Sequence, residues 1–396
     1  MEKLQPKLRF PEFEGDWHKN SFGSIGEIKM CKRILKEQTN DSGDIPFYKI
    51  GTFGSKPNAF ISKDLFDSYR RKYSFPKVGE ILISAAGTIG RKVVYDGKPA
   101  YFQDSNIVWL SHNESILKNT FLSFIYSNIH WQTENTTIPR LYNNIIREKE
   151  IVFPTLPEQT KIASFLTTVD EKIYGLKKQL SLLERYKKGV MQKIFSQELR
   201  FKDENDNGFP DWEEKILSEI ISSFIVPMRD KPKELDGEIP WCRIEDFVGK
   251  YLEKSKSNQG VSVDTVKMMN LKIFPINTLL VSCSANLGFC AIVKTPLITN
   301  QTFIGLVPNM ELIDVEFLYY TMRLSARKLN TLSSGTTISY LSREQFEKFS
   351  ISIPPILEQK KIAAFLTSID EKIEKCQGQI QSMEKWKKGL LQQMFV

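Results

Sequence analysis

The sequence predicts an α+β protein, in which two mixed α/β globular domains are separated by two long antiparallel α-helices with an internal pseudo-twofold repeat. Three observations lead to this prediction. Segment 154–195 returns at 354–395 with about half of its positions identical, the apolar residues of both copies follow a heptad pattern, and the remaining sequence is rich in strand-like segments. The period of this repeat is a whole domain rather than a solenoid unit. A protein built as two similar halves suits a target that also comes in two halves.

The repeated segments predict two helices of about 38 residues, each roughly 57 Å long at 1.5 Å per residue. Each begins near prolines, at 154 and at 354–355, where a helix start tolerates them. Apolar residues recur in alternating steps of four and three, and two such matched seams in one chain pack most simply against each other. The seam positions are Ile162, Leu166, Val169, Ile173, Leu176, Leu180 and Leu183 in the first copy, and Ile362, Leu366, Ile369, Ile373, Ile380 and Met383 in the second.

Outside the helices, strand-like runs such as 80–84 and 278–282 are each followed by a turn of small residues. Because the second globular domain lies between the end of one helix and the start of the other, we expect one globular domain at each end of the antiparallel pair. The expected divisions are a leader and first globular domain over 1–153, a helix region over 154–198, a leader and second globular domain over 199–353, and a helix region over 354–396.

The composition is that of an ordinary globular protein, with 41% hydrophobic and 26% charged residues among 396. No run approaches the roughly 18 apolar residues of a membrane span, and the first residues lack a signal peptide, so we expect a cytoplasmic location. Five cysteines and three histidines show no metal-ligand or disulfide spacing, so we expect reduced thiols and no metal site. The net charge of +8 fits an acidic partner, and its excess lies mainly in the first half of the chain.

Motifs for catalysis are absent from the sequence. It contains no phosphate-binding P-loop, no G-x-G-x-x-G fingerprint and no H-E-x-x-H motif. Asp211, Glu213 and Lys215 are the residue types of a nuclease metal site. They fall on one short leader, however, which favours a solvated acidic link over a catalytic centre. The sequence therefore predicts a non-catalytic chain, with a nuclease as the weaker alternative.

The two globular domains are rich in side chains that bind DNA. Arg and Lys neutralise phosphates, while Arg, Asn and Gln also pair with base edges. Lys49 and Arg243 are favoured, because a basic residue recurs at the equivalent strand position in both halves. The candidates are Lys49, Arg70, Arg71, Lys72, Arg91, Lys92, Arg140, Tyr142, Asn143 and Asn144 in the first domain, and Arg229, Lys231, Arg243, Lys254, Lys256, Asn258, Gln259, Asn300, Gln301 and Tyr340 in the second.

The chain resembles the specificity (S) subunits of type I restriction-modification systems over essentially its whole length. The resemblance rests on P-x-L-P-E-Q-x-K-I-A-x-F-L at 154–166 and its copy at 354–366, and on D-E-K-I at 170–173 and 370–373. It also rests on the K-K-G…F helix ends at 187–195 and 387–395, and on the Leu-Arg-Phe…Trp leaders at 8–17 and 199–212. This combination, doubled at this spacing, is highly specific to the family.

The resemblance implies that each globular domain is a target recognition domain reading one half of a split, asymmetric DNA site. The paired helices would set the spacer and dock two methyltransferase (M) subunits, and two restriction/translocase (R) subunits would complete the assembly. S-adenosylmethionine, ATP and Mg²⁺ would belong to those partners, and this chain would carry no cofactor. The family supplies no catalytic residues, and its base contacts vary too much to be transferred.

The residues themselves support a measuring role. Helices of roughly 57 Å exceed one turn of DNA, which is about 34–36 Å, so two domains could address grooves about one turn apart. The globular domains differ in sequence while the helices stay alike, as expected of a reader of two unlike half-sites, whereas a homodimer would read a palindrome. The main alternative is a coiled-coil scaffold that brings two partners together without reading sequence.

Overall fold

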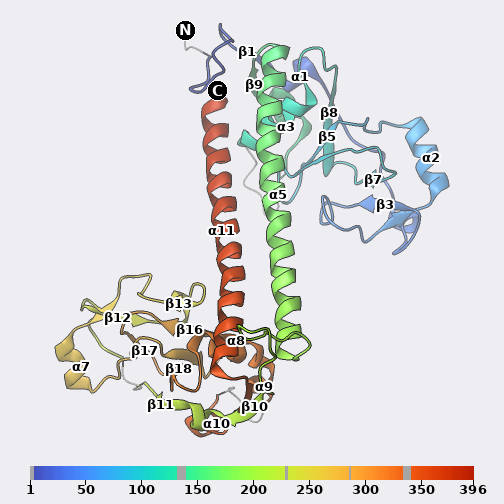
Figure 1. Cartoon of the computed structure of the whole chain (residues 1–396). Coiled ribbons are helices and arrows are strands. Elements are labelled where there is room, and N and C mark those ends of the chain that lie inside the picture. Colours follow the sequence, from blue (N-terminus) through green and yellow to red (C-terminus); the bar gives the residue numbers. More distant parts are fainter. Residues whose placement is uncertain (1–3, 132–139, 228–230, 285–286, 333–339) are drawn as a thin grey trace. The chain divides into compact units, whose positions relative to one another are not determined.

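The computed structural model describes residues 4–131, 140–227, 231–284, 287–332 and 340–396. The chain divides into two compact units (Figure 1). Unit 1 comprises residues 1–179 and 376–396, and unit 2 comprises residues 180–375. Each unit therefore contains one globular domain and a part of both long helices. The predicted α+β fold with two long helices is confirmed.

The described residues of unit 1 form three sheets. A two-stranded antiparallel sheet joins the segment after the leader to the segment before the first long helix. A four-stranded antiparallel sheet in the order β2-β8-β5-β6 forms the centre, and a smaller sheet in the order β4-β3-β7 includes one parallel pair. The strands are β1 (His18–Ser21), β2 (Gly26–Lys29), β3 (Ile45–Tyr48), β4 (Phe60–Ile61), β5 (Ile81–Ser84), β6 (Lys92–Val94), β7 (Tyr101–Phe102), β8 (Ile107–His112) and β9 (Glu150–Phe153).

The helices of unit 1 cover the central sheet and connect it to the long helices. α3 buries Phe121, Leu122 and Ile125 in the same apolar core as Val108 of β8 and Leu166 of the first long helix. This shared core joins the central sheet to the helix pair. Burial of each such side chain contributes about 1.5–3 kcal/mol to stability. The helices are α1 (Phe22–Ile25), α2 (Lys63–Lys72), α3 (Asn119–Asn128) and α4 (Asn143–Glu148), with a 3-10 turn η1 (Lys36–Gln38).

Unit 2 repeats this plan with one addition. Its central sheet has the order β11-β18-β15-β16-β13, so β13 adds a parallel edge strand to the four-stranded arrangement of unit 1. Its smaller sheet, β14-β12-β17, again pairs one strand in parallel. The strands are β10 (Glu213–Ile216), β11 (Ile221–Ile225), β12 (Ile239–Cys242), β13 (Tyr251–Leu252), β14 (Gly260–Val261), β15 (Leu279–Ser282), β16 (Cys290–Val293), β17 (Ile298–Thr299), β18 (Phe303–Pro308) and β19 (Ser350–Ile353).

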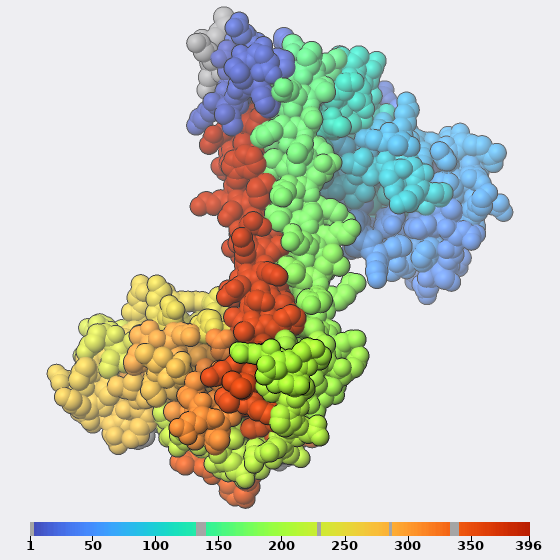
Figure 2. All heavy atoms as spheres, in the orientation of Figure 1, coloured from blue at the N-terminus to red at the C-terminus, as the bar shows by residue number. Residues whose placement is uncertain are grey.

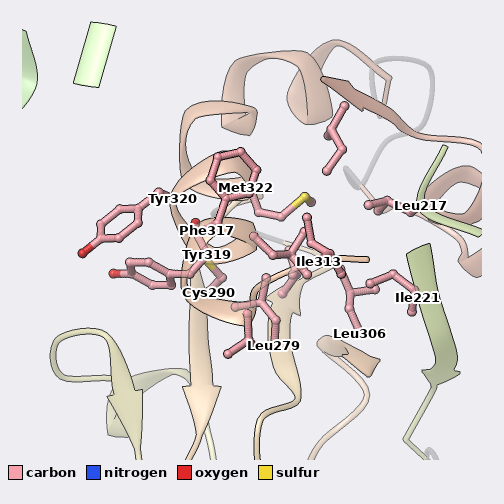
Figure 3. Close-up of a cluster of buried hydrophobic side chains, with 14 of the residues drawn as sticks. Leu217, Ile221, Leu279, Cys290, Leu306, Ile313, Phe317, Tyr319, Tyr320 and Met322 are labelled. Carbon is pink, nitrogen blue, oxygen red and sulfur yellow. The ribbon is translucent and has the colours of Figure 1, made fainter. Parts of the chain in front are cut away.

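The core of unit 2 lies between its central sheet and helix α8 (Figure 3). Phe317 and Met322 of α8 and Leu279 of β15 are fully buried. The hydroxyl groups of Tyr319 and Tyr320 point away from the cluster (Figure 3), so the aromatic rings are buried while their polar ends reach other partners. The helices of this unit are α6 (Leu217–Ile220), α7 (Val263–Met269), α8 (Val315–Leu324), α9 (Ala326–Leu332) and α10 (Arg343–Glu347), with a 3-10 turn η2 (Ile244–Asp246).

The two long helices are α5 (Leu156–Phe195) and α11 (Ile356–Met394), and within each unit they lie side by side and run antiparallel (Figure 1). In unit 1 Asp170 is paired with Lys387, and in unit 2 Lys187 is paired with Asp370, so the same ion pair occurs twice. The seam between them has the burial that the heptads predict. Buried seam positions are Ile162, Leu166, Val169, Ile173, Leu176, Ile362, Leu366, Ile369 and Ile380, whereas Leu180, Leu183, Ile373 and Met383 are half-buried.

Each leader is held to the long helices by the same ion pair. In unit 1 Arg9 Nε and Nη2 each donate to one oxygen of Glu158, over 2.8 Å, and the carboxylate is 1% exposed. In unit 2 Arg200 makes the same two bonds to Glu358, again over 2.8 Å. The Leu8 backbone N–H donates to the carbonyl of Gln393, so the first leader lies against the end of α11 (Figure 2).

The two strands that the sequence predicts are present in the structure. The strands expected over 80–84 and 278–282 are β5 and β15, and a glycine in the left-handed region follows each, Gly90 with φ +79 and Gly288 with φ +84. At Gly288 the close approach matters as well, because an added Cβ would lie 2.4 Å from the Cβ of Ala326. Among the described residues, no helix has the length and apolar character required to cross a lipid bilayer.

Candidate nucleic-acid interface

Unit 1 has a basic cleft of about 340 Å³ beside its smaller sheet. Lys49 follows β3 and is exposed, and Arg140 lies at a bridge with Ala86, in the turn after β5. Arg33 and Lys36 reach the cleft from the segment after β2. Four cationic side chains thus come together from three parts of the sequence, as phosphate binding requires.

Acceptor groups also line the cleft of unit 1. Asp104 lies in the turn between β7 and β8, and its Oδ2 accepts a bond from Arg33 Nε over 3.0 Å. Gln103 Oε1 accepts from the Ile50 N–H over 2.8 Å, which fixes the amide and leaves its NH₂ group as a donor. The cleft therefore offers both donors and acceptors to a ligand.

Unit 2 has a cleft of the same volume, about 340 Å³, at the equivalent place. Arg243 follows β12 as Lys49 follows β3, and Asn300 and Gln301 follow β17 as Gln103 and Asp104 follow β7. Both clefts lie where the parallel pair of the smaller sheet ends. The lining residues are Lys231, Trp241, Arg243, Asn300 and Gln301.

The structure thus brings six of the predicted DNA-binding residues into the two clefts. They are Lys49 and Arg140 in unit 1, and Lys231, Arg243, Asn300 and Gln301 in unit 2. Gln259 joins them indirectly, because its Oε1 accepts a bond from Arg243 Nη2 over 3.0 Å. Tyr340 is exposed at a bridge with Ser284, the position that corresponds to Arg140 in unit 1.

Other candidates lie outside the clefts. The basic run at the end of α2 is exposed, although the Arg70 guanidinium lies over the Phe75 ring at 5.4 Å and Arg71 Nε donates to the Asp67 carbonyl. The remaining positions of this kind are Lys72 at the end of α2, Tyr142, Asn143 and Asn144 at the start of α4, and Lys254, Lys256 and Asn258 before β14. Arg229 lies outside the described residues.

Lys92 and Arg91 both donate hydrogen bonds within unit 1, and their role in binding DNA stays a prediction. Lys92 Nζ donates to the hydroxyl of Ser123 over 2.9 Å and to the Ser123 carbonyl on α3. Burial, and to a smaller extent the nearby charge of Lys387, lower the pKa of Lys92 to about 8. Arg91 Nη1 donates to the Phe53 carbonyl over 2.8 Å, so one nitrogen of this guanidinium is already used in a hydrogen bond within the unit.

Sequence reasoning missed Arg33, Lys36, Gln103 and Asn106. They reach the first cleft because the segment after β2 lies beside the turn between β7 and β8. That contact joins residues about 70 positions apart, and no local pattern encodes it.

The nuclease alternative gains no support from the described residues. Asp211 is fully exposed, and Glu213 forms an ion pair with Lys215 on the same strand, over 3.1 Å. No group of three potential metal-ligating side chains occurs among the described residues.

A family model described as "Type I restriction modification DNA specificity domain" matches residues 14–185 and 210–385. The two matches fall on the two halves of the repeat and together cover most of the chain. The chain therefore belongs to the type I restriction-modification DNA specificity family.

Individual relatives agree with this assignment. A protein of Haemophilus influenzae named as a type I restriction enzyme specificity subunit is 55% identical over 145 residues, which are 36% of this chain and 38% of that relative's length. A similarly named protein of Methanocaldococcus jannaschii is 26% identical over 97% of this chain and 94% of its own. The crystal structure of the type I restriction-modification S subunit from M. genitalium shares the fold, with a TM-score of 0.65 at 18% identity and 99% coverage of both chains.

Proposed function

We propose that this chain is the DNA-reading subunit of a type I restriction-modification complex, and that each cleft meets one half of a split, asymmetric DNA site. The observation that carries this proposal is the pair of clefts. They occupy the same place in two units of the same plan, yet their lining residues differ. Two unlike half-sites require two clefts that lie at equivalent positions but are lined by different side chains.

The long helices would set the spacer between the half-sites and dock two methyltransferase subunits, and two restriction/translocase subunits would complete the complex. The names of the relatives, which call them specificity subunits of restriction enzymes, support this assembly. Methyl transfer from S-adenosylmethionine and ATP-driven, Mg²⁺-dependent cleavage would then belong to the partners. The complex would work in the cytoplasm, where its DNA target is.

An exchange of one globular domain tests the reading of half-sites. Residues 20–150 are replaced by those of a relative, the complex is assembled with methyltransferase subunits, and its methylated sites are mapped by single-molecule sequencing. We expect one half of the recognised sequence to change and the other to stay. A change in both halves would contradict the modular assignment.

The role of the seam is tested with Leu166→Asp combined with Ile173→Asp, which places two carboxylates in a buried interface. We expect the helix pair to open and methyltransferase subunits to be lost from the purified complex. Gln179→Asp, at an exposed position of the same helix, is the matched control and should assemble normally. Normal assembly of the double variant would exclude the seam from this role.

The scaffold alternative makes a different prediction. A scaffold would assemble with partners but show no preference among DNA duplexes. The assembled complex is therefore titrated with duplexes that carry or lack the mapped site, at several salt concentrations, because non-specific binding alone is strongly salt-dependent. Equal affinity for all duplexes would favour the scaffold.

A further inference from the structure

The cleft of unit 2 presents almost only hydrogen-bond donors. The ammonium of Lys231, the guanidinium of Arg243 and the indole of Trp241 cannot accept a hydrogen bond. The Asn300 carbonyl oxygen already accepts from the hydroxyl of Thr302, which leaves the NH₂ group of Asn300 as a donor. Among the described residues that line this cleft, Gln301 is then the one whose side chain can offer an acceptor. A ligand that fits this cleft must be rich in acceptors.

Arg243 is held in position before any ligand arrives. Its Nη2 donates to Gln259 Oε1 over 3.0 Å, and its Nη1 lies 3.6 Å from Glu245 Oε1. Its own backbone N–H donates to Asp246 over 2.7 Å, which ties the end of β12 to η2. A guanidinium has five N–H donors, so these two side-chain contacts leave donors for a ligand. An arginine fixed in this way loses little conformational entropy when it binds.

The equivalent cleft of unit 1 has a different chemistry. Lys49 takes the place of Arg243, and a lysine presents a point charge rather than a planar fork. Asp104 adds a carboxylate that is 17% exposed and accepts hydrogen bonds. A ligand of this cleft must therefore supply donors as well as acceptors, and the two clefts cannot favour the same base pattern.

We propose that Arg243 is a specificity-determining residue that binds the O6 and N7 acceptors of a guanine in the major groove of the half-site read by unit 2. This inference rests on the proposed function. Guanine is the base whose major-groove edge presents two adjacent acceptors, and a planar arginine meets them with two parallel hydrogen bonds. Lys231, an exposed point charge at the same cleft, contacts a neighbouring phosphate.

The experiment uses the chain assembled with its methyltransferase partners and measures binding to duplexes in which each base pair of the mapped site is changed in turn. Arg243→Lys keeps the charge but loses the two-pronged geometry. We expect it to lower the preference for guanine at one position of one half-site by about 10- to 100-fold and to leave the other half-site unchanged. Lys231→Ala is the matched control, and it should weaken all duplexes alike and reduce the salt slope by about 1.

A second measurement begins with the unaltered complex, so its first result does not depend on how the variant folds. The unaltered complex is tested on a duplex with 7-deazaguanine at that position, which lacks N7. We expect affinity to fall for the unaltered chain and to change little further for Arg243→Lys, because both changes remove the same bond.

Three results would overturn the inference: a unit 2 half-site without guanine, a uniform loss of affinity in Arg243→Lys, or an unchanged base preference in that variant. A complex that shows no two-part sequence preference at all would instead refute the proposed function, so the two failures are distinguishable.

Discussion

The ion pair between each leader and its long helix is the most sharply repeated feature at the scale of single residues. Glu158 and Glu358 are almost completely buried, and each is bound by both prongs of an arginine. In unit 1 Trp17 Nε1 also donates to Glu158, over 3.3 Å. A buried carboxylate that loses its partner retains the desolvation cost without the compensating attraction.

We therefore expect Arg9→Ala to destabilise unit 1 by roughly 3 kcal/mol. The measurement is the thermal unfolding midpoint of the full chain. Lys19→Ala is the control, because the Lys19–Glu150 pair spans a similar 2.7 Å but both side chains are more than half exposed. Equal effects of the two substitutions would show that burial of Glu158 does not matter.

Lys92 makes the stability of unit 1 depend on pH. Its pKa falls from 10.5 to about 8, chiefly through burial, so the folded chain binds this proton less tightly than the unfolded chain does. Where the unfolded state binds more protons, stability rises with pH. The contribution of Lys92 is therefore unfavourable below pH 8 and is relieved between about pH 8 and 10.5.

Lys92→Met removes this titration and keeps a long apolar chain over Phe124. We expect the stability of the variant relative to the unaltered chain to decrease as the pH is raised from 7 to 10, measured by urea unfolding. Lys98→Met, at a side chain that is 85% exposed, provides the baseline. A difference that stays constant with pH for Lys92→Met would contradict the argument.

At the scale of elements, a buried polar network in unit 2 joins the edge strand β13 to α8 and α11. Lys250 Nζ, in a residue that is 5% exposed, donates to Glu316 on α8 over 3.0 Å and to Thr367 on α11 over 2.6 Å. The Tyr251 hydroxyl also donates to Glu316. Burial alone would raise the pKa of Glu316, but hydrogen bonds from Tyr251, Lys250 and Thr367 outweigh it and lower the pKa.

The position of α8 is fixed by a second part of this network. The Tyr320 hydroxyl, which points out of the apolar core (Figure 3), donates to Asp370 on α11 over 2.7 Å. Asp370 is also paired with Lys187 of α5.

Unit 1 lacks an acidic residue at the position of Glu316. The corresponding residue in α3 is Thr120, which is exposed, so α3 is attached to its long helix mainly by apolar contacts.

A double-mutant cycle measures this attachment. Lys250→Met and Glu316→Leu should each destabilise unit 2, since each leaves a partly buried group without its partner, whereas the double variant should recover much of the loss. We expect a coupling of about 1–3 kcal/mol at pH 7. Because the pKa of Glu316 is lowered, the coupling is present above pH 4.5 and is lost as the pH falls through the folded-state pKa. Additive effects at pH 7 would exclude the network.

The elements that were predicted correctly are those whose signal is local or repeated. The heptads predict the buried faces of α5 and α11 directly, and the short apolar runs followed by turns of small residues predict the strands β5 and β15. The clefts depend on contacts between distant segments, such as Arg33 with Asp104, so only part of each lining was predicted. The contact of Lys92 with Ser123 could not be predicted either, because it depends on where α3 packs against the edge strand β6.

At the scale of the whole molecule, the two units differ in charge as well as in hydrogen bonding. The first cleft gathers Arg33, Lys36, Lys49 and Arg140, whereas the second contains Lys231 and Arg243. This agrees with the sequence, in which basic residues are in excess in the first half of the chain and balanced by acidic residues over 213–353. The first cleft therefore presents more positive charge to an acidic ligand than the second does.

The division between the units crosses both long helices, between Gln179 and Leu180 in α5 and between Lys375 and Cys376 in α11. The Lys187–Asp370 pair of unit 2 and the Lys387–Asp170 pair of unit 1 each lie on their own side of these points. An insertion at both points therefore lengthens the helix pair without cutting into either globular domain or its attachment.

Insertion of one heptad at each of these two points tests whether the helices measure the spacer. Seven residues add about 10 Å of helix, and base pairs are about 3.4 Å apart, so we expect the gap between the half-sites to grow by about three base pairs. The heptad keeps the apolar seam in phase, and a four-residue insertion, which shifts it, is the control and should destabilise the pair. Methylated sites are mapped for each variant. Because both clefts stay intact, the bases of each half-site should be unchanged, and altered bases or an unaltered gap would show that the helices do not set the distance.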